Sequence, residues 1–327
     1  MGGSPCVRAG GRTGASVRRF RAAERPTPER AQRRYGQPRE LTRRAVRSVI
    51  VIRYPFPMHW LAALPMYNVT PALAADWRTL LAHVREHLAD WLSARGDTLD
   101  IVDPDRDLTA FWLRGDVLFS QTCGYPLVHA LADRVRLIGA PDFDVPGCES
   151  GTYRSVLVAG GHVGAQTIER CRGLRAAYND DDSNSGMNLF RHAVAPFAHD
   201  GRFFASVTKT GAHLASLRAL AEGRADVAAI DCVTFAFAQA HLPELTDGVR
   251  ALGMTASAAA LPFIASMRVP QDAIDTILQA LAGALDHDPA LAARLRLRGV
   301  VRRTQADYAP ILDYERDAIG RGYPRLA

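Results

Sequence analysis

Short apolar runs alternate with longer amphipathic segments along most of the chain after residue 58. The run at 60–67 comes first, and residues 71–92 then place apolar side chains at helical spacing. We predict strands at 60–67, 99–102, 117–120, 135–138, 153–159, 174–178, 203–208, 226–230 and 263–267. We predict helices at 71–92, 126–133, 188–198, 213–222, 233–240, 272–285 and 289–297.

Strands that alternate with helices are typical of a parallel sheet covered by helices on both faces. Such a sheet binds ligands at the loops beyond the carboxyl ends of its strands. The region that shows this alternation has about 270 residues, which is large for one sheet of this kind. The sequence therefore predicts an α/β protein with two lobes and a ligand cleft between them.

The first 50 residues differ in composition from the rest of the chain. They contain 13 Arg and 3 Glu, a net charge of +10, whereas the whole chain carries +6. A segment so poor in large apolar residues cannot offset its ordering entropy by burial, so we predict residues 1–57 to be a disordered Arg-rich extension. We favour a segment upstream of the true start over a transit peptide or a basic arm for nucleic acid.

The charge and hydropathy of the remaining residues exclude several classes of partner. They carry a net charge of −4 and have no basic stripe with interleaved aromatic residues, so nucleic acid is not an expected partner. No apolar run reaches the roughly 18 residues of a membrane span. Residues 43–60 place an apolar patch after basic residues, but Arg53 interrupts it and no small-residue cleavage site follows, so they make no convincing signal peptide.

The five cysteines are spread along the chain without a CxxC pair. They are Cys6, Cys123, Cys148, Cys171 and Cys232. This spacing does not indicate a structural zinc site, and we predict neither a metal nor a cofactor. Cys123 and Cys148 lie in loops that contain Gly or Pro, where they either pair in an oxidising compartment or stay free thiols.

The stretch DDDSNSGMN (180–188) lies between a predicted strand and a predicted helix. Its spacing matches the first half of a calcium-binding EF-hand loop, but His192 stands where that loop needs a bidentate Glu. Ser183 or Ser185 can instead cap the helix by accepting a backbone N–H. The same helix start can also hold an oxyanion between backbone N–H groups and the two hydroxyls, since Gly186 lets a ligand approach the backbone.

Two further strand-to-helix corners carry polar residues, Thr210 with His213 and then Asp231. Each corner is open to two interpretations, a helix cap or a ligand contact. Three such corners in succession predict a ligand site better than any one of them. Tyr67 and the segment Gln121–Tyr125 follow predicted strands in the first half of the chain, where a packing role is equally open.

Sequence signatures of enzymes are absent. The chain has no GxSxG, HExxH or P-loop motif, and the glycine-rich run at 160–164 lacks the spacing of a dinucleotide-binding loop. We therefore predict a binding protein and not an enzyme.

Six stretches together resemble the phosphate/phosphite/phosphonate-binding proteins of ABC transporters, which have the type 2 periplasmic-binding fold. The likeness spans about residues 59–300. The stretches are LPMYN (64–68), SQTCGYPL (120–127), PGCESGTYRS (146–155), NDDDSNSGMN (179–188), TGAHLASLRAL (210–220) and GRADVAAIDCVTF (223–235).

The resemblance implies two α/β lobes that close on the ligand and are joined by two crossing strands. It places lobe one at 58–155 and 257–327 and lobe two at 156–256. The family's Ser-x-Ser-Gly helix start maps onto Ser183, Asn184 and Ser185, which would hold the phosphonate oxygens. The ligand-binding residues that we predict are Tyr67, Gln121, Tyr125, Ser183, Asn184, Ser185, Thr210, His213 and Asp231.

The function that the resemblance implies is binding of a small oxyanion (phosphonate, phosphite or phosphate) as the substrate-binding component of an ABC transporter. An ABC transporter permease would be the protein partner. The location would be periplasmic, although the absence of a convincing signal peptide leaves a cytoplasmic location open. Two alternatives are an enzyme on the same fold that acts on a phosphorylated cofactor precursor, and a ligand-sensing module.

Overall fold

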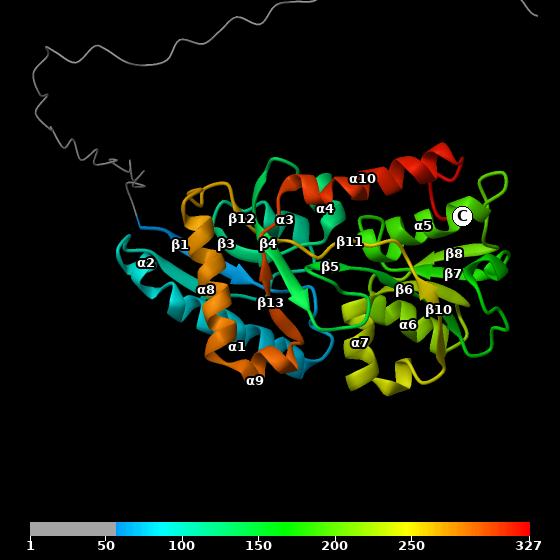
Figure 1. Cartoon of the computed structure of the whole chain (residues 1–327), viewed down its shortest axis with the longest axis horizontal. Coiled ribbons are helices and arrows are strands. Elements are labelled where there is room, and N and C mark those ends of the chain that lie inside the picture. Colours follow the sequence, from blue (N-terminus) through cyan, green and yellow to red (C-terminus); the bar gives the residue numbers. More distant parts are fainter. Residues whose placement is uncertain (1–56) are drawn as a thin grey trace, which may run out of the picture. The chain divides into compact units, whose positions relative to one another are not determined.

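The computed structural model describes residues 57–327 of the chain. The predicted extension at 1–57 and Cys6 therefore lie outside the described residues, apart from Pro57. Two large β-sheets with their helices make up the described part, and two short strands form a third sheet (Figure 1). This arrangement confirms the predicted α/β class.

The first large sheet has six strands in the order β13-β4-β12-β3-β1-β2. Strand β1 pairs in parallel with β2 and β3, so these three strands end at the same edge of the sheet. Strand β12 is antiparallel to β3 and β4, and β13 is antiparallel to β4. The strands are β1 (His59–Ala63), β2 (Thr98–Ile101), β3 (Val117–Gln121), β4 (Val135–Phe143), β12 (Phe263–Ser266) and β13 (Leu297–Val301).

Helix α1 (Pro71–His87) shows how the local sequence forms an element of this half. Thr70 caps its first turn by accepting the Leu73 N–H at 3.2 Å, and Pro71 occupies a first-turn position that needs no N–H donor. The single helix predicted over 71–92 is interrupted at Leu88, after which α2 begins. The other helices in these segments are α2 (Ala89–Ser93), α3 (Leu108–Trp112), α4 (Gly124–Val128), α8 (Ala273–His287) and α9 (Pro289–Arg294).

The second large sheet has five strands in the order β10-β6-β9-β7-β8. Strand β7 pairs in parallel with β8 and β9, whereas β6 is antiparallel to β9 and to β10. The strands are β6 (Ser155–Gly160), β7 (Arg175–Tyr178), β8 (Ser206–Lys209), β9 (Val227–Asp231) and β10 (Val249–Met254). The helical segments are η1 (Ile168–Cys171), η2 (Asn184–Asn188), α5 (Leu189–Val194), η3 (Ala195–Phe197), α6 (His213–Ala221), α7 (Cys232–His241) and η4 (Pro243–Leu245).

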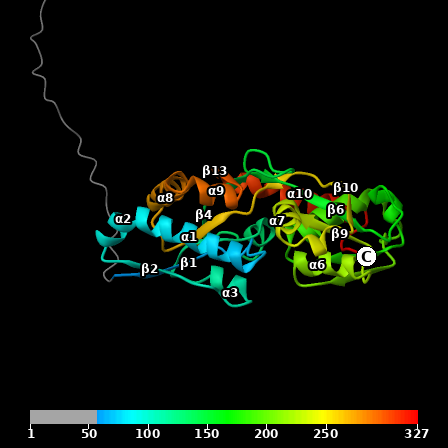
Figure 2. The same cartoon turned by 90° about the horizontal axis from the view of Figure 1, so that it is seen from below.

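Short strands and a long helix connect the segments of the two sheets. Strand β5 (Thr152–Tyr153) pairs antiparallel with β11 (Ala258–Ala259). Helix α10 (Gln305–Gly320) contacts both α4 and α5, beside which it lies in Figure 1. Figure 2 shows the same helix from a second side. The Ala327 carbonyl oxygen accepts the backbone N–H of Phe203 at 2.7 Å, so the C-terminal tail packs on the second sheet's half. The predicted lobe limits stay a prediction.

The sheets differ from the wholly parallel arrangement that simple strand–helix alternation indicates. Strands β4, β12 and β13 form antiparallel pairs in one sheet, and β6 and β10 do so in the other. Hydrophobic periodicity did not predict β10, β11, β13, α3 or α10. Helix α10 contains Pro310, which normally argues against a helix, and β13 contains Gly299 between charged and apolar residues. Within residues 57–327, no helix has the length and apolar character needed to cross a membrane.

Candidate functional site

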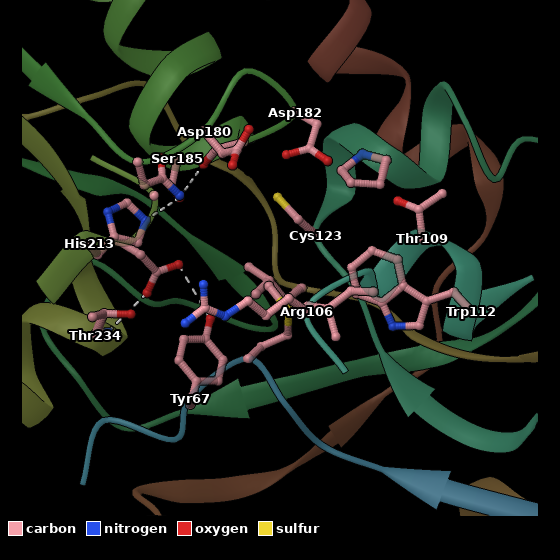
Figure 3. A pocket seen from close by; sticks show the side chains of 18 of the residues that line it. Tyr67, Arg106, Thr109, Trp112, Cys123, Asp180, Asp182, Ser185, His213 and Thr234 are labelled. Atoms are coloured by element: carbon pink, nitrogen blue, oxygen red, sulfur yellow. Dashed lines mark hydrogen bonds between the residues drawn. The ribbon is translucent and has the colours of Figure 1, made fainter. Parts of the chain in front are cut away.

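Loops that follow three parallel strands of each sheet line a pocket with a volume of ≈ 360 Å³ (Figure 3). This is the edge at which sheets of this type bind ligands. The segments of the first large sheet supply Met66, Tyr67, Arg106, Asp107, Leu108, Thr109, Trp112, Cys123, Pro126 and Leu261. The segments of the second large sheet supply Asn179, Asp180, Asp182, Ser183, Ser185, Gly211, His213, Asp231 and Thr234. We call these two groups of segments the first and the second half of the molecule.

Ser183 caps η2, the helical segment that follows β7 and borders the pocket. Its Oγ accepts the backbone N–H of Gly186 at 3.0 Å, which confirms the predicted cap. The Oγ of Ser185 lies 3.3 Å from the Oγ of Ser183, and both side chains are buried. Because a hydroxyl that accepts a hydrogen bond can still donate its proton, two donors are available to an anion at this helix start.

The residues behind this helix start hold it in place. Asn184 donates from Nδ2 to the Tyr153 hydroxyl at 2.9 Å, and Asn188 donates to Asn184 Oδ1 at 3.0 Å. The Ser155 hydroxyl donates to the carbonyl oxygen of Ser185 at 3.0 Å. The helical turn Asn184–Asn188 has the π form, which is frequent at functional sites. Asn184 is therefore a support of the turn and does not line the pocket.

His213 lies beside the paired serines. Its Nε2 is 2.8 Å from Ser185 Oγ, and burial lowers the pKa of the ring to about 4. The imidazole is therefore neutral near neutral pH, and this contact holds the Ser185 side chain beside the ring. The buried Nδ1 has no hydrogen-bond partner among the described residues. A ligand group that reached Nδ1 would satisfy it.

Asp231 combines both roles that the sequence left open. Its Oδ1 accepts the backbone N–H of Val233 at 2.9 Å and of Thr234 at 3.0 Å, so it caps α7. Its Oδ2 accepts the Tyr67 hydroxyl at 3.3 Å from the other half of the molecule. Burial raises the pKa of Asp231 to about 6, and it also lines the pocket. This carboxyl can therefore carry a proton under mildly acidic conditions.

The chain's one lysine binds two of the three consecutive aspartates. Lys209 Nζ is 2.7 Å from Asp180 and 2.9 Å from Asp181. Asp182 makes no ion pair among residues 57–327, and burial followed by the charge of Asp180 raises its pKa. Asp180 and Asp182 both line the pocket. Arg106 is the arginine among the residues that line the pocket.

The structure brings five of the nine predicted site residues together at the pocket and directs four elsewhere. The five are Tyr67, Ser183, Ser185, His213 and Asp231. Asn184 supports the turn behind the pocket. Gln121 Nε2 donates to the Leu261 carbonyl at 3.2 Å, and the Tyr125 hydroxyl donates to Glu315 at 2.7 Å. Thr210 Oγ1 bonds the Tyr178 carbonyl at 3.0 Å. A ligand contact by these four residues stays a prediction.

The sequence analysis missed the loop after β2 as part of the pocket. This loop and α3 supply Arg106, Thr109 and Trp112. The predicted strand at 99–102 could have indicated this loop. In a parallel sheet, the loop that follows this strand lies at the same edge as the loop after β1.

One group within the described range could hold a metal ion, and it lies outside the pocket. The ligand atoms of His83, Glu86 and His287 are within 4.8 Å of one another. They stand on α1 and α8.

Comparison with known proteins places these observations in a family context. A family model described as the periplasmic substrate-binding protein of phosphonate ABC transporters matches residues 113–308. A binding protein component of an ABC phosphonate transporter from Pseudomonas aeruginosa is 13% identical over 82% of this chain and 88% of its own, with a TM-score of 0.63. No curated protein matches the chain in sequence.

Two other solved structures share the fold. PhnD1 from Prochlorococcus marinus, in complex with methylphosphonate, is 13% identical over 81% of this chain and 100% of its own, with a TM-score of 0.63. A protein from Xanthomonas citri bound to ATP is 12% identical over 81% of this chain and 98% of its own, with a TM-score of 0.58. These likenesses confirm the two-lobed α/β fold of the periplasmic binding proteins.

Proposed function

Because the chain belongs to the family of periplasmic substrate-binding proteins of phosphonate ABC transporters, we propose that it binds a small oxyanion in the pocket. The ligand is a phosphonate, phosphite or phosphate, and the protein delivers it in the periplasm to a transporter permease. The observation that carries the proposal is the partly buried hydrogen bond between Ser185 Oγ and His213 Nε2 at a helix start that Ser183 caps.

The pocket would hold the oxyanion through side-chain donors that already lie side by side. With His213 Nε2–H as the donor to Ser185 Oγ, the hydroxyls of Ser183 and Ser185 would turn away from their mutual 3.3 Å contact and donate to two of its oxygens. A protonated Asp231 would donate to a third oxygen. Hydrogen bonds to charged oxygens are short and strong, and they strengthen further when the lobes close and remove water.

A first experiment is calorimetric titration of the protein with phosphate, phosphite and methylphosphonate, with sulfate as the control anion. We expect saturable 1:1 binding of at least one phosphorus oxyanion and recovery of that compound unchanged. Failure of all three to bind would refute the proposed function. Their conversion into products would favour the alternative of an enzyme on this fold.

The charge of the pocket favours a ligand that carries a positive group beside its oxyanion. Asp182 lines the pocket without an ion pair among the residues that the structure describes, and Asp180 lies next to it. An aminoalkylphosphonate would place its ammonium group near these carboxylates. The Asp182→Asn variant should then bind 2-aminoethylphosphonate roughly tenfold more weakly and methylphosphonate no more weakly.

Calorimetry with both ligands checks this prediction. Asp181→Asn is the matched control, because Asp181 binds Lys209 and does not line the pocket. Equal losses for the two ligands in Asp182→Asn would contradict a specific contact with the ammonium group.

The affinity for the oxyanion should fall as the pH rises through about 6, because burial holds the pKa of Asp231 near that value. Below this pH the carboxyl is protonated and can donate to the anion, and above it the carboxylate repels the anion. Asp231→Asn keeps a capping oxygen but cannot ionise. Between about pH 5 and about pH 8, the ratio of the wild-type to the variant dissociation constant should rise roughly tenfold.

Titrations of both proteins across this range measure that ratio, and the comparison cancels the ionisation of the ligand itself. A ratio that is independent of pH would show that Asp231 does not face the bound anion.

A further inference from the structure

Two thiols meet beside the pocket at a place that the proposed binding of an oxyanion does not use. The Sγ atoms of Cys148 and Cys232 lie 3.4 Å apart, although 84 residues separate them in the chain, and both are free thiols. Cys148 lies between β4 and β5, and Cys232 is the first residue of α7, next to Asp231. The sequence alone leaves open a pairing of Cys148 with Cys123.

The backbone at the Gly147 turn and at the start of α7 brings the two thiols close together. Gly147 has a φ of +96°, and a Cβ there would lie 3.2 Å from the Cys232 Cβ. The turn is closed by the Cys148 N–H, which donates to the Val145 carbonyl at 3.0 Å. A glycine turn thus lies directly against the start of a capped helix, so the meeting of the thiols does not depend on two flexible side chains.

The other described cysteines are engaged elsewhere. Cys123 Sγ accepts the Asn184 N–H at 3.3 Å, and Cys171 Sγ donates to the Thr167 carbonyl at 3.5 Å. Cys232 is fully buried, whereas Cys148 is partly exposed. Cys148 is therefore the sulfur of this pair that a reagent in solution reaches first.

We propose that Cys148 and Cys232 form a disulfide that links the turn before β5 to the start of α7. The sulfurs need to approach by about 1.4 Å to reach bonding distance. The Cys148 thiolate attacks an external disulfide such as oxidised glutathione and releases one thiolate. The Cys232 thiolate then attacks the Cys148 sulfur and releases the second. Two protein thiols lose two protons and two electrons, and the external disulfide becomes two thiols. The periplasm, where the family acts, is an oxidising compartment.

The disulfide would constrain the helix that presents Asp231. It closes a long loop in the unfolded chain, so the oxidised protein should unfold at a temperature roughly 5–10 °C above that of the reduced protein. A second consequence rests on the proposed function. The link ties α7 to the segment that leads into β5, so the oxidised protein should release its anion more slowly than the reduced protein.

Peptide mapping of the full chain tests the disulfide directly. After equilibration with excess oxidised glutathione, alkylation and trypsin digestion without reductant, we expect residues 137–154 joined to residues 225–250. The joined species should disappear after reduction, and in Cys148→Ser and Cys232→Ser separately. It should persist in the control Cys171→Ser.

Alkylation of both thiols under oxidising conditions, or a link from Cys148 to Cys123, would overturn the proposal. The wild-type result does not depend on any variant folding. If the joined peptide forms but the rates of anion release are equal in both redox states, the effect on exchange is refuted and the disulfide stands. If no anion binds at all, the proposed function fails and the peptide map is unaffected.

Discussion

Replacement of Ser183 and Ser185 together by alanine is expected to weaken phosphonate binding by at least about a hundredfold. Each hydroxyl would donate to a charged oxygen, and such hydrogen bonds contribute roughly 1.5–3 kcal/mol apiece. The change also removes the acceptor of the Gly186 N–H and the partner of His213 Nε2, so the remaining groups lose their orientation. Calorimetry with the ligand that binds the wild-type protein measures the loss.

A matched control separates binding from helix capping. Thr70→Ala removes an N-cap hydroxyl from α1, where it accepts the Leu73 N–H outside the pocket. We expect both proteins to lose roughly 1 kcal/mol of folding free energy for the missing cap, and only the serine variant to lose binding. An affinity that stays within twofold of the wild type in the folded serine variant would be incompatible with the proposed site.

The substitution Gly186→Ala should have the second largest effect. A Cβ at this position would overlap the side-chain oxygen of Asn179 and lie 2.9 Å from its Cγ, with His213 Cε1 at 3.0 Å on the same side. Either the Asn179 side chain or the turn would have to shift. We expect a loss of about 1–3 kcal/mol in the free energy of unfolding. Binding should fall by at least about tenfold, because the displaced groups line the pocket.

Denaturant unfolding and calorimetry measure the two losses. Gly164→Ala is the control, since a Cβ at Gly164 would meet no atom within 4 Å. If Gly186→Ala bound the anion as tightly as Gly164→Ala, the close packing of Asn179 and His213 on this turn would have no part in recognition.

The sequence could place Ser183, His213 and Asp231 at one edge of a sheet because their positions follow local rules. Ser183, His213 and Asp231 each stand just after a strand and at the start of a helical segment, which the hydrophobic periodicity locates. Parallel strands then bring these positions to one edge of a sheet without any further information. The family resemblance pointed to the same residues.

The sequence could not predict in which direction a side chain points at the end of a strand. Gln121 and Tyr125 follow the pattern of the other site residues, yet Gln121 bonds the Leu261 backbone and Tyr125 bonds Glu315. Both partners come from segments more than 100 residues later in the chain. Only the tertiary packing decides whether such a side chain faces the pocket or a neighbouring segment.

Tertiary packing also decides which strands are antiparallel. Strand β12 lies between β3 and β4 although it follows them by more than 100 residues, so its pairing is set by the return of the chain to the first sheet. Local periodicity predicts that it is a strand and cannot predict its direction. The meeting of Cys148 with Cys232 likewise depends on the place of the Gly147 turn against α7.

The charges around the pocket are compatible with the anion site that we propose at a helix start beside three aspartates. Lys209 binds Asp180 and Asp181, and the raised pKa of Asp231 lets that carboxyl carry a proton under mildly acidic conditions. Arg106, from the loop after β2, adds a positive charge to the pocket lining. Asp107 and Asp182 also line the pocket and make no ion pair among the described residues, so their carboxylates would favour a ligand that carries a cationic group.

A crystal structure of the protein grown with methylphosphonate is the most direct measurement of the central claim. We expect a tetrahedral group whose oxygens lie within hydrogen-bond distance of Ser183 Oγ and Ser185 Oγ, with His213 and Asp231 beside it. An oxyanion bound elsewhere on the molecule at saturating concentration, with this helix start in contact only with water, would contradict the account.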